Sequence, residues 1–295
     1  MQNSGFIVGL GEVLWDVFPN EKRLGGAPAN FAYHVSQLGL NGCVVSAVGN
    51  DELGQDALTA LDNKRVCHQI EKVSYPTGTV QVVVDRQGVP QYKICEEVAW
   101  DHIPFSPEIE KVARQTQTVS FGSLAQRNAD SRAVIRRFLG ALPEKAVKVF
   151  DINLRQHYYT SEVITESLAL SDILKINEEE VHWVSEMLGL GVCNEMDICS
   201  YLLNHYKLDM VILTEGVRGS YVHTSSATSY LPTPEVNVVD TVGAGDSFTA
   251  AFIVALLKGK PITEAHRFAV DVSAYVCTQR GAMPLLPASI TDRIR

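Results

Sequence analysis

Asp240-Thr-Val-Gly-Ala-Gly-Asp246-Ser-Phe-Thr-Ala-Ala-Phe252 joins a turn of small residues to an apolar segment and places a carboxylate where the two meet. After Asp246 the apolar residues recur at helical spacing, and Gly259 and Pro261 signal the end of a helix. The first turn of a helix has free backbone N–H groups, which bind anions. The stretch therefore predicts an anion site beside a proton acceptor, which suits phosphoryl transfer to a hydroxyl group.

The same turn has a simpler interpretation as an ordinary helix start. Glycine and alanine followed by an aspartate place an acid in the first turn, where it is stabilising without any catalytic role. The turn is not a P-loop, because the chain contains no G-x-x-x-x-G-K-[ST] segment. Nor is it a dinucleotide-binding fingerprint, because Phe248 occupies the third glycine position.

A second glycine turn near the N-terminus also precedes a helix. It reads Gly25-Gly-Ala-Pro-Ala-Asn-Phe-Ala-Tyr-His-Val-Ser-Gln-Leu-Gly39, in which Phe31 and Leu38 share one helical face and Gly39 is placed to end the helix. By itself Asn30 would be a cap or an ordinary first-turn residue. In this order, the two stretches closely resemble the G-G-x-x-x-N and D-T-x-G-A-G-D signatures of the ribokinase-like (PfkB) carbohydrate kinases.

Strand-like and helix-like segments alternate along the chain, which predicts an α/β fold with a doubly wound, mostly parallel sheet and helices on both faces. The expected buried strands are Phe6–Leu10, Cys43–Val48, Val147–Ile152, Asp172–Ile176 and Met210–Thr214. Two of the expected helices are Asp130–Leu142 and Glu178–Leu188.

Two stretches, 13–23 and 77–103, break this alternation and read as β segments with no helix between their strands, the second with a hairpin turn at Asp85–Gly88. The resemblance implies that they form a small β-sheet lid over the sugar, on a single ribokinase-like domain that spans residues 1–295. An exposed sheet usually needs cover, so we expect lid closure or a homodimer that pairs through the lid. A β-meander without function is the alternative.

The composition describes an acidic chain of 295 residues, of which 46% are hydrophobic, enough for a sizeable core. The net charge of −9 argues against a nucleic-acid surface, which needs clustered basic residues. No stretch approaches the ~20 apolar residues of a membrane span, and the first apolar run lacks the basic residues of a signal peptide. The six cysteines form no C-x-x-C pair and are widely spread, so we expect no disulfide framework and a cytoplasmic protein.

Asp246 is the candidate general base, which accepts the proton of the attacking hydroxyl group. The candidate anion hole consists of the backbone N–H groups of Gly243, Ala244 and Gly245, which would stabilise the charge that develops on the phosphate. No lysine side chain is needed for that role.

Two further segments match the nucleotide end of the family. Asn177-Glu-Glu-Glu180 resembles its N-x-x-E segment, which implies that Asn177 and Glu180 organise Mg²⁺ and the phosphates of ATP, largely through water. The same residues fit a capping box at the start of a helix. The loop after the strand Met210–Thr214 resembles the family's T-x-G-x-x-G segment, which implies that ATP is bound at Thr214, Gly216 and Gly219.

The candidate sugar-binding residues lie in and near the N-terminal signature. The resemblance implies that Asp16, Gly26 and Asn30 hydrogen-bond the hydroxyl groups of the substrate, a task to which carboxylate and amide groups are suited.

The fructokinase branch of the family is the most similar. Asp151-Ile-Asn-Leu-Arg155 resembles the D-P-N-L-R of fructokinases, with isoleucine in place of proline, and three more segments also look like that branch: Gly11–Asp16, Ala99–Asp101 and Phe121–Arg127. They add Asn153, Arg155 and Trp100 as candidate sugar-binding residues. Trp100 is equally consistent with a core residue, and Arg155 with a surface residue.

The resemblance also implies a monovalent-cation site, for which K⁺ is the expected ion. The site would use a carboxylate and nearby backbone carbonyl groups, around Asp240, Val242, Val276, Gln279 and Gly281. Leu285 stands where some relatives place a serine hydroxyl group, and this departure argues against potassium dependence.

The chain is therefore expected to be an ATP- and Mg²⁺-dependent kinase of a small-molecule sugar, with D-fructose as substrate and fructose 6-phosphate as product. Alternatives with the same chemistry are another sugar, 2-keto-3-deoxygluconate or a nucleoside. A sugar or nucleotide sensor without activity is the alternative of a different class. Asp246 argues against a sensor, because a binding protein needs no base at that position.

Overall fold

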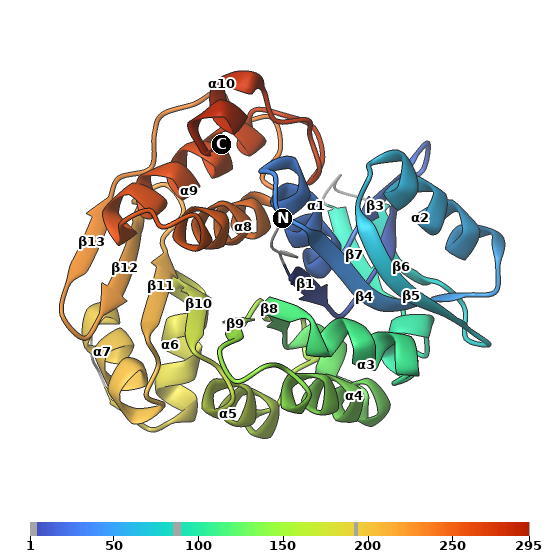
Figure 1. Cartoon of the computed structure of the whole chain (residues 1–295), viewed down its shortest axis with the longest axis horizontal. Coiled ribbons are helices and arrows are strands. Elements are labelled where there is room, and N and C mark those ends of the chain that lie inside the picture. Colours follow the sequence, from blue (N-terminus) through green and yellow to red (C-terminus); the bar gives the residue numbers. More distant parts are fainter. Residues whose placement is uncertain (1–4, 85–89, 192–193, 295) are drawn as a thin grey trace.

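The computed structural model describes residues 5–84, 90–191 and 194–294, and most of them form a nine-stranded sheet between two layers of helices (Figure 1). The strand order is β13-β12-β11-β10-β9-β8-β1-β4-β5. The strands are β1 (Phe6–Leu10), β4 (Gly42–Gly49), β5 (Cys67–Val73), β8 (Thr116–Gly122), β9 (Val147–Asp151), β10 (Ile173–Asn177), β11 (Met210–Thr214), β12 (Ser220–Thr224) and β13 (Thr228–Leu231). From β5 to β11 every pair is parallel, whereas β12 and β13 add an antiparallel edge.

A smaller sheet of four strands has the order β3-β2-β6-β7. Its strands are β2 (Leu14–Val17), β3 (Lys22–Gly25), β6 (Gly78–Val84) and β7 (Pro90–Ile94). It is joined to the large sheet just after β4, where Asp51 accepts hydrogen bonds from the Thr77 N–H (2.8 Å) and the Thr77 hydroxyl group (2.6 Å).

Helices cover both faces of the large sheet (Figure 1). The helices α1 (Ala27–Gln37), α8 (Ala244–Leu257) and α9 (Ile262–Cys277) pack on one face, with α2 (Glu52–Asn63) beside α1. The other face carries α3 (Pro107–Arg114), α4 (Ala129–Gly140), α5 (Ser161–Ala169), α6 (Glu178–Met187) and α7 (Glu195–His205). The remaining elements are α10 (Ala288–Thr291) and three short 3₁₀ helices, η1 (Ala99–His102), η2 (Leu124–Gln126) and η3 (Asp292–Ile294).

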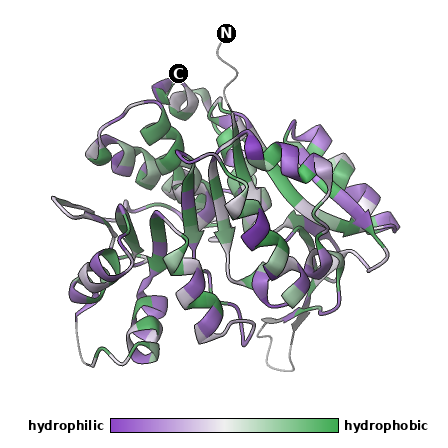
Figure 2. Ribbon diagram, turned by 60° about the horizontal axis from the view of Figure 1, so that its bottom comes forward, coloured by the Kyte–Doolittle hydropathy of each residue, from purple (hydrophilic) through white to green (hydrophobic). Residues whose placement is uncertain are grey.

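The two helical layers give the sheet two separate cores. In β1, Ile7 packs with α1, α8 and α9, while Val8 and Leu10 pack into the opposite core, since successive side chains of a strand point to opposite faces. Both faces are therefore largely apolar, and green predominates in the central strands in Figure 2, with some white and purple positions between. This explains the continuous apolar runs of the sequence, which are typical of parallel strands covered on both sides.

Helix α8 is enclosed by protein on all sides. Its nine consecutive residues from Ser247 to Ala255 are buried, because it lies between α1, α9 and the sheet. Gly259, with φ of 78°, follows the helix in the left-handed conformation that ends helices. The sequence prediction of an apolar helix that stops before Gly259 is confirmed.

The expected fold class is confirmed, including the predicted bounds of β1 and β11 and the two β segments of the smaller sheet. One expectation is wrong in detail: residues 99–102, which were expected to be β structure, form the 3₁₀ helix η1. The predicted hairpin turn at Asp85–Gly88 lies outside the described residues. No helix in the described part of the chain is long and apolar enough to cross a membrane.

Candidate active site

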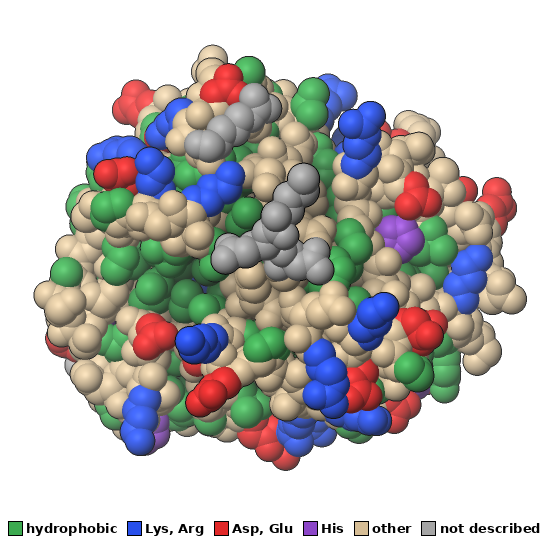
Figure 3. Space-filling view, viewed as in Figure 1, with side chains coloured by type: hydrophobic (Ala, Val, Ile, Leu, Met, Phe, Trp, Pro, Cys, Tyr) green, Lys and Arg blue, Asp and Glu red, His purple; other side chains and the backbone are tan. Residues whose placement is uncertain are grey.

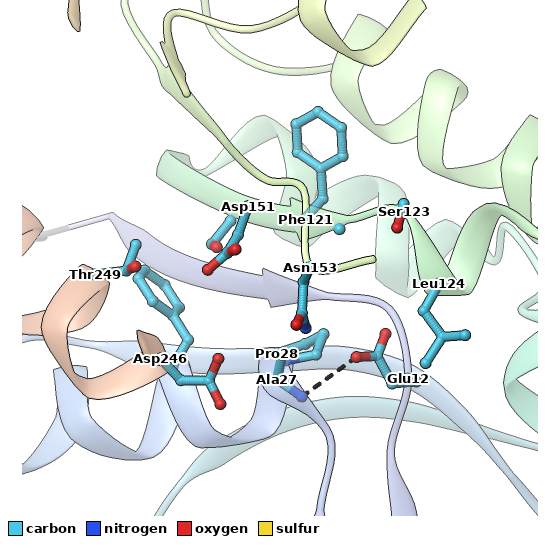
Figure 4. A pocket seen from close by; sticks show the side chains of 13 residues that line it. Glu12, Ala27, Pro28, Phe121, Ser123, Leu124, Asp151, Asn153, Asp246 and Thr249 are labelled. Atoms are coloured by element: carbon cyan, nitrogen blue, oxygen red, sulfur yellow. Dashed lines mark hydrogen bonds between the residues drawn. The ribbon is translucent and has the colours of Figure 1, made fainter. Parts of the chain in front are cut away.

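The carboxyl ends of the parallel strands meet at one edge of the large sheet, and a small cavity opens there (Figure 4). Glu12 follows β1, Ser123 follows β8 and Asn153 follows β9, and all three line the cavity together with Asp246 of α8. In the sheet, β1 lies between β4 and β8, so the strand order along the chain reverses at β1. Ligands of open α/β sheets bind at such a switch point, outside the carboxyl ends of the strands.

The turn before α8 has the geometry of an anion site. Gly243 caps the helix in the left-handed conformation, with φ of 77°, and a Cβ atom there would lie 2.6 Å from the Cβ of Ala282. The Ala244 N–H donates to the Thr241 carbonyl oxygen at 3.2 Å, so it is not free for a ligand. Gly245 follows in the first turn, where an N–H has no acceptor within the helix. Of the predicted amides, Gly245 is thus better placed than Ala244 to bind a phosphate oxygen.

Asp246 joins the two glycine signatures of the sequence. Its Oδ2 accepts a hydrogen bond of 2.7 Å from the Asn30 side chain of α1, across 216 residues. Burial and, to a smaller extent, the nearby Asp151 raise the pKa of Asp246 to about 6, against the opposing effects of Asn30 and Lys175. The carboxyl group is therefore mostly ionised at neutral pH, yet basic enough to take a proton.

A buried ion pair lies directly beside the glycine turn. Lys175 of β10 donates from Nζ to Asp151 Oδ1 at 3.1 Å, and a Cβ atom on Gly245 would lie 3.1 Å from the same Nζ. Burial alone would lower the pKa of Lys175, but the charges of Asp151 and Glu180 outweigh it and raise the pKa above its usual value. The sequence analysis missed this lysine; its signal is a cation inside an otherwise apolar strand.

The segment that begins α6 forms the capping box. The Asn177 side chain accepts from the Glu179 and Glu180 N–H groups, and Glu180 Oε2 accepts from the Asn177 N–H at 2.9 Å. The other oxygen of Glu180, Oε1, accepts from the Leu154 N–H, also at 2.9 Å. Glu180 therefore holds the loop after β9 against the start of α6. The structural interpretation of this segment is confirmed.

The acidic side chains of this site fit a magnesium ion that is bound through water molecules. Within the described ranges, no group of three or more His, Cys, Asp or Glu side chains is arranged to hold a metal ion. Each oxygen of Glu180 accepts one backbone hydrogen bond and retains a lone pair for a water molecule. The donor set suits Mg²⁺ that keeps most of its water and is bound mainly by phosphate oxygens.

Glu12 is a second carboxyl group in the cavity that the sequence analysis did not identify. It is 4% exposed, its Oε1 accepts from the Ala27 N–H at 3.3 Å, and its Oε2 has no hydrogen-bond partner in the part of the chain that the structure describes. Burial raises the pKa of Glu12 to about 7, and the charge of Asp246 adds to the rise. In the view of Figure 4, the Asn153 side chain lies between the carboxylates of Glu12 and Asp246. The signal in the sequence is an acidic residue two positions after a buried strand.

The predicted sugar residues Asp16, Gly26 and Arg155 surround the same region. Burial raises the pKa of Asp16 to about 6, with Arg23 and Arg155 acting against the rise. Gly26, with φ of 109°, caps α1, and a Cβ atom there would lie 2.3 Å from the Glu12 carbonyl oxygen. Arg155 is exposed, but its charge acts on Asp16 and also on Asp246.

Trp100 lies away from the cavity. It is fully buried in the core, and the Arg127 guanidinium stacks on its ring at 4.0 Å while forming a buried ion pair with Asp101. The cavity-lining residues do not include Trp100. Its burial is that of a core residue, and a contact between Trp100 and the sugar stays a prediction.

The predicted nucleotide residues lie further along the same edge of the sheet. Thr214 ends β11 and pairs in register with Asn177 of β10, so the two segments are neighbours. Gly216 and Gly219 both have positive φ, of 54° and 143°, and the Glu215 N–H donates to the Gly219 carbonyl oxygen at 2.9 Å. The loop is therefore a tight turn beside the first turn of α6.

Three of the residues assigned to a monovalent cation are close together. Asp240 accepts from the N–H groups of Val242 and Gly281, each at 3.0 Å. Arg23 lies 3.4 Å from the same carboxylate. The guanidinium supplies positive charge where a K⁺ ion would require a free carboxylate.

Comparison with known proteins gives a consistent result. A model of the pfkB family carbohydrate kinases matches residues 6–289. The sequence is 29% identical to a protein from Pyrococcus horikoshii that is described as an uncharacterized sugar kinase, over 94% of this chain and 92% of that one, and the crystal structure of that protein in complex with ATP has a TM-score of 0.78. The structural match covers 93% of each chain at 28% identity.

Two relatives differ in the acceptor that their names state. Probable fructokinase-5 of Arabidopsis thaliana is 28% identical over 97% of this chain and 96% of its own. An ATP-dependent 6-phosphofructokinase of Thermoanaerobacterium thermosaccharolyticum is 30% identical over 90% of this chain and 83% of its own. The first name indicates a free sugar and the second a sugar phosphate.

Proposed function

Because the chain belongs to the pfkB family of carbohydrate kinases, an ATP-dependent sugar kinase family, we propose that it transfers the γ-phosphoryl group of ATP to the primary hydroxyl group of D-fructose, giving fructose 6-phosphate. The observation that carries the proposal is the hydrogen bond between Asp246 and Asn30 at the cavity, directly beside the glycine turn that begins α8. A base, an anion site and a polar acceptor site thus adjoin one another, as in-line phosphoryl transfer requires.

In the proposed reaction Asp246 accepts the proton of the attacking hydroxyl group. The Asn30 amide orients the carboxylate by donating to Oδ2, and the free N–H groups of the first turn of α8 bind the oxygens of the transferring phosphoryl group. Lys175 lies beside that turn, and its charge adds to the stabilisation of the negative charge there. Asp16, Gly26, Asn153 and Arg155 bind the other groups of the sugar.

At the nucleotide end, Thr214, Gly216 and Gly219 are proposed to contact ATP. Asn177 and Glu180 are proposed to hold Mg²⁺ through water, and the ion when bound neutralises phosphate charge. We retain K⁺ binding at Asp240, Val242, Val276, Gln279 and Gly281 as a proposal that Arg23 opposes, since its guanidinium already faces Asp240.

A free sugar is favoured over a sugar phosphate by the charges around the acceptor site. A phosphate group on the acceptor would need unpaired basic side chains, whereas Arg23 forms ion pairs with Glu21 and Asp240. Arg155 alone is a weak site for a dianion. The fructokinase relatives support fructose, and the 6-phosphofructokinase relative makes fructose 6-phosphate the competing acceptor to test.

The deciding experiment measures ADP release from Mg-ATP with fructose, other free sugars, 2-keto-3-deoxygluconate, nucleosides and fructose 6-phosphate. We expect fructose to give the highest kcat/KM, and Asp246→Asn to lower kcat by about 10²- to 10⁴-fold with nearly unchanged ATP affinity. Near-normal kcat in this variant would show that Asp246 is not the general base. Turnover with another acceptor would correct the substrate, and binding without turnover would identify a sensor.

A further inference from the structure

Two cysteines outside the proposed active site lie side by side on neighbouring strands. Cys43 of β4 and Cys67 of β5 are directly opposite each other in the parallel register. Their sulfur atoms are 3.1 Å apart, within hydrogen-bonding distance for thiols. Parallel neighbours in a sheet lie ~4.8 Å apart, which is inside the range of ~4.4–6.8 Å between the Cα atoms of a disulfide. The backbone is therefore already at the spacing that a disulfide requires.

The two thiols differ sharply in their surroundings. Cys43 is completely buried in the core under β4, whereas Cys67 is exposed at the start of β5, the edge strand of the sheet. The close contact between the two sulfur atoms lowers the pKa of Cys67 to about 7 and, together with burial, raises that of Cys43, which stays protonated. Near neutral pH a large share of the accessible Cys67 is therefore the nucleophilic thiolate, whereas the buried Cys43 remains a thiol.

We propose that Cys43 and Cys67 form an oxidisable dithiol, a modification site that reacts with hydroperoxides at Cys67 and closes to a disulfide between β4 and β5. The Cys67 thiolate attacks the peroxide, the O–O bond breaks, and Cys67 becomes a sulfenic acid while the other oxygen leaves as an alcohol or water after taking a proton. The Cys43 sulfur then attacks the sulfenic sulfur, and its proton leaves with the hydroxide as water. The thiols lose two electrons, which the peroxide gains, and an external thiol reverses the reaction.

The other described cysteines show why this pair is specific. Cys95 contacts the Thr79 hydroxyl group rather than another thiol, and Cys199 is buried. Cys277 is partly exposed, and burial raises its pKa, which lowers its reactivity. Cys277 therefore serves as a control: a partly exposed thiol with no hydrogen bond to another sulfur in the described part of the chain.

The test treats the reduced full-length protein with hydrogen peroxide near equimolar amounts, alkylates the remaining thiols and maps the peptides by mass spectrometry. We expect a cross-linked peptide containing Cys43 and Cys67, with the loss of two hydrogen atoms from the intact mass, both reversed by dithiothreitol. Cys67→Ser abolishes the cross-link, and Cys277→Ser retains it. A peptide map in which Cys67 stays reduced, pairs with another cysteine or is overoxidised while Cys43 stays free would overturn the proposal.

A second measurement tests the role of the buried partner. The rate of Cys67 alkylation should be half-maximal near pH 7 in the native protein and move toward the ordinary thiol pKa of ~8.5 in Cys43→Ala. An unchanged pH profile would contradict the hydrogen-bonded pair. If Cys43→Ala fails to fold, the peptide map of the native protein still decides. Cys67→Ser should retain sugar-dependent ADP release. The cross-link therefore tests the dithiol proposal, and ADP release tests the kinase proposal independently.

Discussion

At the scale of single residues, Asp246 must be ionised to accept a proton, yet it lies in a partly buried site with Asp151 nearby. Because burial and Asp151 raise its pKa to about 6, kcat/KM should fall about tenfold per pH unit below that value and level off above pH 7. The measurement is kcat/KM for the preferred acceptor across the acidic range, with Glu12→Gln as a control that should retain the same acidic limb. A profile that stays flat to pH 5 would contradict the assigned base.

The buried Glu12 side chain makes the stability of the fold depend on pH. Its pKa is raised from 4.5 to about 7 by burial, so the native state holds this proton more tightly than the unfolded chain does. The stability from the neutral carboxyl group is complete below pH ~4.5 and is lost as the pH rises through 7. Glu12→Gln should therefore increase the free energy of unfolding by less than about 1 kcal/mol at pH 5 and by up to about 3 kcal/mol at pH 8.

Thermal unfolding of both proteins at the two pH values provides the measurement. Equal destabilisation by Glu12→Gln at pH 5 and pH 8 would show that the side chain matters for packing and not through its charge. A larger gain at pH 8 than at pH 5 would support a desolvated carboxylate in the native protein.

The site residues that could be predicted from the sequence lie in local sequence signatures, whereas the others are brought to the site by the order of the strands. Asp246 and Asn30 stand in local signatures, so a sequence indicates them, and the structure adds that they touch. Lys175 belongs to no such signature, and Glu12 stands in the fructokinase-like segment Gly11–Asp16 without a role assigned to it. Their places depend on which strands become neighbours at the carboxyl edge of the sheet, and this information is spread over the whole chain.

At the scale of elements, the start of α8 depends on Gly243. Gly243 and Gly259 have nearly the same φ, of 77° and 78°, but a Cβ atom would collide with Ala282 only at Gly243, while Gly259 has open space. Gly259→Ala should therefore cost about 1 kcal/mol through backbone strain and retain kcat. Gly243→Ala should cost more and also lower kcat, because the first turn of α8 must shift.

Paired unfolding curves and steady-state kinetics distinguish the two effects. Similar losses of stability and activity in both variants would mean that the left-handed conformation alone matters. Retained kcat in a destabilised Gly243→Ala variant would show that the anion site does not depend on the position of this turn.

Elements were predictable where the local pattern is strong and unpredictable where tertiary contacts decide. The short apolar strands β1 and β11 were found with their correct ends, since they are buried on both faces. The segment 99–102 reads as a continuation of the β region but folds as η1, because Trp100 enters the core and the Asp101 side chain accepts from the Val98 N–H at 3.2 Å. The β12–β13 hairpin carries no comparable apolar run and was not predicted.

At the scale of the whole molecule, dimerisation through the four-stranded sheet stays a prediction. Among the residues of that sheet whose exposure is described, 14–17, 22–25, 78–81, 93 and 94, none is an exposed large hydrophobic residue. On the face shown in Figure 3, the Lys and Arg side chains are interspersed with Asp and Glu side chains.

Light scattering coupled to size-exclusion chromatography tests this prediction directly. We expect a mass of twice the 32.4 kDa of the chain, with or without sugar and nucleotide. A mass of one chain under all conditions would contradict the dimer. The four-stranded sheet would then be expected to cover the site by closing over the sugar within one chain.

The enclosure of α8 has a consequence for the order in which the protein loses function on denaturation. Since nine consecutive residues of α8 are buried between both helical neighbours and the sheet, its amide hydrogens should exchange with solvent deuterium only when the whole molecule unfolds. The carboxylate of Asp246 is fixed to this same helix, and it leaves its place only when the helix does. Mild denaturant should therefore first loosen peripheral elements, while the proton acceptor persists until the last cooperative transition.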